Sequence, residues 1–186
     1  MSNILTTHVG SLPRSKELSD FLFAKDKGEK FSQSSFDEVL KNNVASVVKK
    51  QLDVGIDFVS DGEMSKISYA TYIKDRIDGF SGESERRAPA DLDDFPEYKE
   101  KIAKSGGTPT YTRPCCTNEL KVKDETSLIK DINNFKNSLD KLNHRNAFMN
   151  SASPGVINVF MPNKFYSSED EYLDKLSNIM AKEYEV

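Results

Sequence analysis

Residues 51–63 read QLDVGIDFVSDGE and join a helix to a strand within a few positions. The helical pattern ends at Leu52, and Gly55 follows where a left-handed residue commonly closes a helix. Residues 56–60 are short, apolar and rich in strand-forming side chains. Polar residues 61–63 then leave the strand. A helix that enters a strand through one glycine is typical of an α/β protein.

The segment before this junction predicts an amphipathic helix. Its apolar residues recur at steps of three and four: Phe36, Val39, Leu40, Val44, Val47, Val48 and Leu52. Ser35 and Glu38 have the spacing of a capping box, so we expect Ser35 to cap the first turn. Further upstream, residues 4–9 predict a strand that runs into a Gly-Ser-Leu-Pro loop, and residues 15–25 predict a short helix.

Downstream, strands and helices continue to alternate. We expect a helix over 69–77, a long charged excursion over about 81–110, and an extended, buried segment over 110–122. A helix over 128–142, a short strand over 147–149 with turn residues 150–155, and a final helix capped by Ser168 and Glu171 complete the pattern.

Alternating strands and helices predict a mainly parallel α/β sheet. The polar loops 10–11, 61–63 and 151–153 each follow a predicted strand, so they converge if the strands are parallel. An eight-stranded TIM barrel needs about 250 residues, and the chain has 186. We therefore expect residues 1–186 to form about the first four βα units of a (β/α)8 barrel, the N-terminal part of a longer protein. The alternative is a complete flavodoxin-like open sheet.

Composition excludes several classes of protein. The net charge is −4 and no basic patch occurs, which argues against a nucleic-acid binder. No apolar run reaches the length of a membrane span, and the N-terminus lacks the pattern of a secretory signal. The two cysteines are adjacent and cannot build a disulfide framework. We therefore expect a cytoplasmic protein. No Gly-rich phosphate loop follows a predicted strand, which disfavours a nucleotide-binding sheet.

Four motifs occur in a distinctive order: TTHVGSLPR at residues 6–14, the junction at 51–63, TRP at 112–114 and SPGV at 153–156. Together they resemble the catalytic, C-terminal barrel of cobalamin-independent methionine synthase and its short single-barrel relatives. The resemblance implies methyl transfer from 5-methyltetrahydrofolate polyglutamate to homocysteine. A related thiol alkyltransferase, similar to the epoxyalkane–coenzyme M transferases, and a noncatalytic binding module remain alternatives.

In this family a zinc ion binds the substrate thiol as its more nucleophilic thiolate. The family's zinc ligands are a His-x-Cys pair, a further acid in some members, and a distant Cys, and no His-x-Cys occurs in this chain. The resemblance thus implies that the ligands lie beyond residue 186, that the chain holds no metal ligand or catalytic residue, and that it is inactive alone. Cys115 and Cys116 are expected to be buried structural residues, because adjacent strand residues point to opposite faces.

The resemblance carries substrate-binding roles onto eight residues. Val9, Gly10 and Ser11 match the loop that meets the amino-acid end of homocysteine, and Glu63 matches the carboxylate that binds its ammonium group. A carboxylate just past a strand end suits a charge-assisted hydrogen bond. Arg14 is expected either to bind a ligand carboxylate or the folate's glutamate tail, or to cap a helix.

The remaining three residues of this set concern the folate. Thr110 and Tyr111 match positions that touch the pterin or its tail, and Phe160 matches an aromatic ring that stacks on it. Packing in the core is the alternative for Phe160, because phenylalanine is commonly buried.

Overall fold

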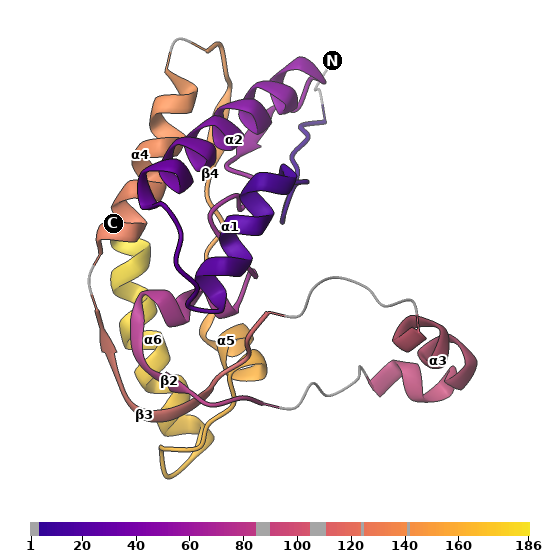
Figure 1. Cartoon of the computed structure of the whole chain (residues 1–186), viewed down its shortest axis with the longest axis vertical. Helices are drawn as coiled ribbons and strands as arrows, with labels where there is room; N and C mark the ends of the chain where they lie inside the picture. The colour runs from indigo at the N-terminus through magenta and orange to yellow at the C-terminus, as the bar shows by residue number, and fades with distance from the viewer. Residues whose placement is uncertain (1–3, 85–89, 105–110, 124, 141) are drawn as a thin grey trace.

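The computed structural model describes residues 4–84, 90–104, 111–123, 125–140 and 142–186. Helices α1 (Lys16–Asp26) and α2 (Gln33–Asp53) lie side by side near the N-terminus (Figure 1). The Ser32 hydroxyl accepts a hydrogen bond from the Ser35 amide and caps α2. The expected cap at Ser35 is therefore wrong, because Ser32 offers the same chemistry one turn earlier. Gly55 has φ 83° and closes the helix as predicted.

A small parallel sheet supports the candidate site. Strands β1 (Phe58–Ser60) and β4 (Asn146–Phe148) pair in parallel, with Val59 opposite Ala147. Thr7 forms a parallel bridge to Phe58 on the other edge of β1. The predicted strands at 56–60 and 147–149 are confirmed, whereas the expected strand over 4–9 is reduced to this bridge. All three segments point the same way, so the loops that follow them leave at one edge.

A second pair of strands, β2 (Ile77–Ser81) and β3 (Cys115–Val122), is antiparallel and separate from the first sheet. The prediction of a mainly parallel sheet is wrong for this part. The expected helix over 69–77 is also wrong: a short 3₁₀ helix, η1 (Thr71–Asp75), leads directly into β2. Among the described strands, only the parallel pair has the arrangement of a βα barrel, so the four-unit half barrel remains a prediction.

Gly79 explains why β2 pairs closely with β3. Its φ is 109°, and a Cβ at this position would lie 2.9 Å from the carbonyl oxygens of Asn118 and Glu119. The register also shifts between Asp78 and Phe80, as in a β-bulge. A residue without a side chain is needed here, and the requirement comes from a strand about 40 positions away in the chain.

The expected excursion contains the helices η2 (Ala90–Asp94) and α3 (Pro96–Lys104), which pack on each other and lie apart from the other elements in Figure 1. Helix α4 (Thr126–Leu139) packs on α2. Helix α5 (Pro154–Phe160), where turn residues were expected, is capped by Ser153. Helix α6 (Glu169–Glu185) is capped by Ser168, as predicted. None of the helices in the described segments has the length and apolar character needed to cross a membrane.

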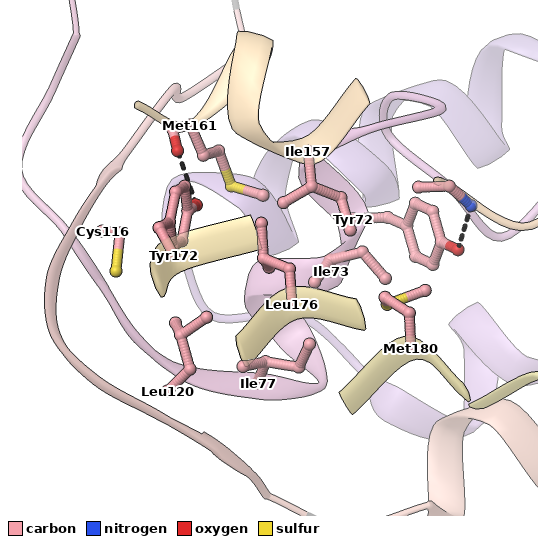
Figure 2. Packing of buried hydrophobic residues seen from close by; sticks show 11 residues of the cluster. Tyr72, Ile73, Ile77, Cys116, Leu120, Ile157, Met161, Tyr172, Leu176 and Met180 are labelled. Carbon is pink, nitrogen blue, oxygen red and sulfur yellow. Dashed lines mark hydrogen bonds between the residues drawn. The ribbon is translucent and has the colours of Figure 1, made fainter. Parts of the chain in front are cut away.

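Two apolar clusters hold these elements together. One gathers residues of α1, α2, β1, the loop after β1 and α4: Leu18, Leu22, Phe36, Leu40, Val44, Val47, Val48, Val59, Met64 and Phe135. The other packs one face of α6 against η1, β2, β3 and α5 (Figure 2). In it, Tyr172, Leu176 and Met180 have no exposed surface, and the Tyr172 hydroxyl donates to the Met161 carbonyl at 2.7 Å. The second cluster fixes α6 behind the loop that follows β4.

Candidate functional site

The loops that follow Thr7, β1 and β4 meet around a cavity of about 380 Å³. The cavity is lined by Val9, Gly10, Ser11, Glu63, Lys66, Tyr69, Asn150, Ser151, Ala152, Ser153 and Val156. They come in part from the three polar loops that the sequence predicted to follow strands, at residues 10–11, 61–63 and 151–153. The structure therefore brings four predicted site residues together: Val9, Gly10, Ser11 and Glu63.

Glu63 forms part of this cavity wall, and the residue is only 4% exposed. The Ser11 hydroxyl donates to Oε2 at 2.6 Å, and the Asn150 side-chain amide donates to Oε1 at 3.1 Å. Each oxygen thus has one donor from a different loop. Because a carboxylate has about four acceptor positions, Glu63 keeps capacity for a further donor such as an ammonium group.

The backbone before Glu63 turns sharply. Gly62 has φ 64° and Glu63 has φ 56°, so both are left-handed. This conformation costs a residue with a side chain about 1 kcal/mol. The Asp61 carboxylate accepts a hydrogen bond from the Glu63 amide at 3.1 Å, and the Gly62 carbonyl accepts one from the Leu12 amide at 3.0 Å. Asp61 therefore stabilises the turn that aims Glu63, and burial raises the pKa of its carboxyl group.

Arg14 holds the same turn from behind. One of its terminal nitrogens donates to the carbonyl oxygens of Glu63 and Lys66, both at 2.7 Å. Burial lowers the pKa of the Arg14 guanidinium, while Glu63 and Asp61 oppose that effect. Arg14 does not line the cavity. Neither expected role of Arg14 included this contact with the Glu63 turn. The hydrogen bonds of its side chain go to the turn and not to a helix end. A role of Arg14 in binding a ligand stays a prediction.

Lys66 is a charged residue of the cavity wall that the sequence interpretation missed. It is 3% exposed, its ammonium group donates to the Asn150 carbonyl, and it lies 4.6 Å from the centre of the Tyr72 ring. Burial lowers the pKa of Lys66, whereas the charges of Asp61 and Glu63 raise it. The sequence signal that could have identified Lys66 is its position three residues after Glu63. Both residues belong to one turn, in which the Lys66 amide donates to the Glu63 carbonyl.

Helix α6 supports the third loop from behind. The Tyr72 hydroxyl accepts from the Ala152 amide at 3.1 Å and donates to Glu183 at 3.0 Å. Ser151 also donates to Glu183, at 2.9 Å, and Tyr184 donates to the Ala152 carbonyl at 2.6 Å. The bond from Tyr72 to the Ala152 amide is one of the dashed lines in Figure 2. The loop after β4 is thus held by side chains at the end of α6.

An aromatic cluster adjoins the cavity at Tyr69. The Tyr69 and Phe160 rings meet edge to face at 5.1 Å. The Arg113 guanidinium lies over Phe160 at 5.5 Å and over Tyr111 at 5.2 Å, and borders a second cavity of about 440 Å³. Phe160 belongs to neither apolar cluster, so the core-packing alternative for it is not supported. Thr110 lies outside the described residues.

The described side chains do not fit a zinc ion. They include no group of three or more His, Cys, Asp or Glu residues close enough to bind one metal. Cys115 and Cys116 are buried, and their sulfur atoms face the carbonyl oxygens of Glu83 and Asn118. Burial raises the pKa of the Cys116 thiol to about 11, which disfavours the thiolate that zinc requires.

Comparison with known proteins identifies relatives of this fold. Residues 4–90 match the family described as "Cobalamin-independent synthase, Catalytic domain". A methionine synthase from Sulfolobus acidocaldarius is 25% identical over 178 residues, which cover 96% of this chain and 46% of that protein. A 5-methyltetrahydropteroyltriglutamate–homocysteine methyltransferase from Bifidobacterium longum is 32% identical over 75 residues, or 40% of this chain and 10% of that protein.

Two solved structures share the fold. A B12-independent methionine synthase from Shewanella sp. W3-18-1, in complex with selenomethionine, has a TM-score of 0.64 and 17% identity over 97% of this chain. A putative vitamin-B12 independent methionine synthase from Listeria monocytogenes has a TM-score of 0.59 and 18% identity over 98% of it. The chain spans 48% and 47% of those two chains, about half of each. Residues 4–90 are therefore similar to the catalytic domain of that family, and the chain shares the fold of these two solved structures.

Proposed function

We propose that this chain carries the amino-acid-binding part of an enzyme that transfers a methyl group to the thiol of homocysteine, with 5-methyltetrahydrofolate polyglutamate as the donor. The named activities of the Sulfolobus and Bifidobacterium relatives support this reaction. The Shewanella relative was solved with selenomethionine, an amino acid with the same α-carbon groups as homocysteine. A cytoplasmic location is part of the proposal.

The observation that carries the proposal is the Glu63 carboxylate in the cavity at the end of the parallel strands, with Ser11 and Asn150 each donating to one of its oxygens. Held in this way, Glu63 would bind the ammonium group of homocysteine by a charge-assisted hydrogen bond. The Gly10 backbone has φ 99°, with open space where a Cβ would lie, so a ligand can approach the main chain there.

The folate is proposed to bind at the aromatic cluster beside the cavity. Tyr111 and Phe160 flank Arg113, which supplies a positive charge between two rings. An aromatic ring and a guanidinium are suited to a flat heterocycle and to a carboxylate tail, respectively. Tyr69 lines the amino-acid cavity and touches Phe160, so the two proposed ligands would meet near Tyr69.

Zinc would supply the activation of the thiol in this reaction, by binding it as a thiolate. Since the described side chains do not form a set that fits the ion, the proposal assigns no zinc ligand and no catalytic residue to them. The chain's own contribution is to bind and orient the amino acid.

Isothermal titration with L-homocysteine under reducing conditions tests the proposal. Glu63→Gln should weaken binding by about 1.5–3 kcal/mol, the size of a hydrogen bond to a charged group. Glu17→Gln, on the exposed face of α1, is the matched control and should leave binding unchanged. Equal affinity of Glu63→Gln and the unaltered chain would remove Glu63 from the site.

The same titration separates the alternatives. Tighter binding of a thiol that has no amino group, such as coenzyme M, with no response to Glu63→Gln, would favour a different thiol acceptor. Binding of homocysteine without methionine formation, when the methyl-folate triglutamate is added, is the expected result for the chain alone, because no zinc ligand and no catalytic residue is assigned to its described side chains.

A further inference from the structure

We propose that Lys66 anchors the α-carboxylate of the amino acid whose ammonium group Glu63 binds. This inference rests on the proposed function and adds a specificity-determining residue to the same cavity. It makes the wall around Glu63 a receptor for both charges of a zwitterion, rather than for a thiol alone.

The cavity wall carries two opposite charges. Among the described residues that line it, Glu63 is the one anion and Lys66 the one cation. They come from a single turn, in which the Lys66 amide donates to the Glu63 carbonyl at 3.1 Å. Within the described residues their side chains form no ion pair, and the Glu63 oxygens accept from Ser11 and Asn150 instead. Two separated, opposite charges in one cavity match an α-amino acid, which carries both.

The Ser11 hydroxyl and the Arg14 guanidinium, at or near the cavity, already have hydrogen-bond acceptors within the protein. The Ser11 hydroxyl has a single hydrogen to donate, and Glu63 accepts it. Arg14 donates to two carbonyl oxygens of the turn and is not among the cavity-lining residues. A ligand carboxylate that enters the cavity therefore finds Lys66 as its cationic partner.

The hydrogen bonding and burial of the Lys66 ammonium group also favour this role. A lysine ammonium has three N–H donors, and the described residues provide this one with the Asn150 carbonyl and the face of the Tyr72 ring. The residue is 3% exposed, so little water reaches its ammonium group. A buried charge is stabilised by each additional partner. The carboxylate of a bound amino acid would supply one.

A purely structural role for Lys66 is the competing explanation, because its bond to Asn150 links the loop after β1 to the loop after β4. Both roles predict weaker ligand binding when Lys66 is replaced. They differ in whether the loss depends on the ligand's carboxylate. A ligand that keeps the ammonium group and the side chain but lacks the carboxylate separates the two roles.

The experiment compares L-methionine with L-methioninol, in which a hydroxymethyl group replaces the carboxylate. Titration calorimetry on the whole chain measures both affinities for the unaltered protein, Lys66→Met and the control Lys16→Met, whose side chain is 88% exposed. We expect the unaltered chain and the control to prefer methionine by about tenfold or more, the effect of a charged hydrogen bond. Lys66→Met should lose most of that preference while binding methioninol nearly as well as before.

Other outcomes overturn the inference in distinguishable ways. If Lys66→Met loses affinity for both ligands by the same factor, Lys66 is structural and the proposed function survives. If the unaltered chain binds neither ligand, the proposed function and this inference fail together.

A second measurement does not depend on the folding of Lys66→Met. In the unaltered chain labelled with ¹³C-lysine, the Lys66 Cε resonance, assigned through Lys66→Arg, should shift with methionine and stay in place with methioninol. Equal shifts with both ligands, or no shift with methionine, would contradict the proposal.

Discussion

The Ser11 hydroxyl donates a 2.6 Å hydrogen bond to Oε2 of Glu63 across 52 positions of the chain. The bond joins the loop after Thr7 to the loop after β1, and Asn150 adds the loop after β4 through Oε1. The carboxylate is thus oriented by two donors of the protein itself. A group that is already oriented loses less entropy when it binds a ligand, so these contacts favour affinity.

Ser11→Ala should weaken homocysteine binding by about 1 kcal/mol, or roughly fivefold, because one of the two donors that orient Glu63 is lost. Ser11→Thr keeps a hydroxyl at this position and serves as the control, with affinity close to that of the unaltered chain. Calorimetric titration of both variants checks the effect. A Ser11→Ala chain that binds as tightly as Ser11→Thr would show that the hydrogen bond plays no part in binding.

Tyr72→Phe should loosen the loop after β4. The Ala152 amide would lose its acceptor, and a buried group left without a partner costs about 1–3 kcal/mol. We expect faster hydrogen exchange at the Ala152 amide and a lower free energy of unfolding in urea. Tyr98→Phe, on the exposed helix α3, is the control and should change neither. Unchanged exchange at Ala152 would disprove the role of Tyr72 in holding this loop.

Gly79→Ala should destabilise the chain more than Gly28→Ala does. Both glycines have positive φ, so each substitution carries the conformational cost of about 1 kcal/mol. Only at Gly79 would the new Cβ lie 2.9 Å from two backbone oxygens of β3, whereas Gly28 has open space. Chemical denaturation measures both free energies of unfolding. Equal losses would mean that the β2–β3 pairing is not as close as described.

Asp57 should contribute stability above its ordinary pKa and lose it in acid. Hydrogen bonds from the Thr6 amide at 2.8 Å and the Thr6 hydroxyl at 3.1 Å lower the pKa of the Asp57 carboxyl below 3.8. Because the folded state holds the proton less tightly than the unfolded state, the contribution is complete above 3.8 and disappears as the pH falls through the folded pKa.

Asp57→Asn measures this contribution. Its free energy of unfolding should fall below that of the unaltered chain at neutral pH, and the difference should shrink as the pH falls below 3.8 and through the lowered pKa of Asp57. Thr6→Val removes one of the two hydrogen bonds, so an NMR titration should show the Asp57 pKa moving back toward 3.8. A difference between Asp57→Asn and the unaltered chain that is independent of pH would contradict the assigned cause.

Local patterns in the sequence predicted α1, α2, β1, β4 and α6 because helical periodicity, serine caps and a closing glycine depend on neighbours a few positions away. They did not predict β2, because its pairing depends on Gly79 meeting a strand far along the chain. Helix α5 was missed because Ser153 and Pro154, which open it, are also turn residues.

The sequence likewise predicted only part of the candidate site. The position of Glu63 at a strand end was visible in the sequence, and the structure brings it to Ser11. The contacts of Arg14 with backbone carbonyls and the burial of Lys66 were not visible, since a charged residue in a polar loop is usually solvated. Tertiary packing alone determines such contacts.

The most direct test of the amino-acid cavity is an NMR titration of the ¹⁵N-labelled chain with L-homocysteine under reducing conditions. The account predicts that the largest shifts fall on the amides of Gly10, Ser11, Glu63 and Asn150, with little change in α3. Shifts that avoid these four amides, or a spectrum that does not respond to homocysteine, would contradict it.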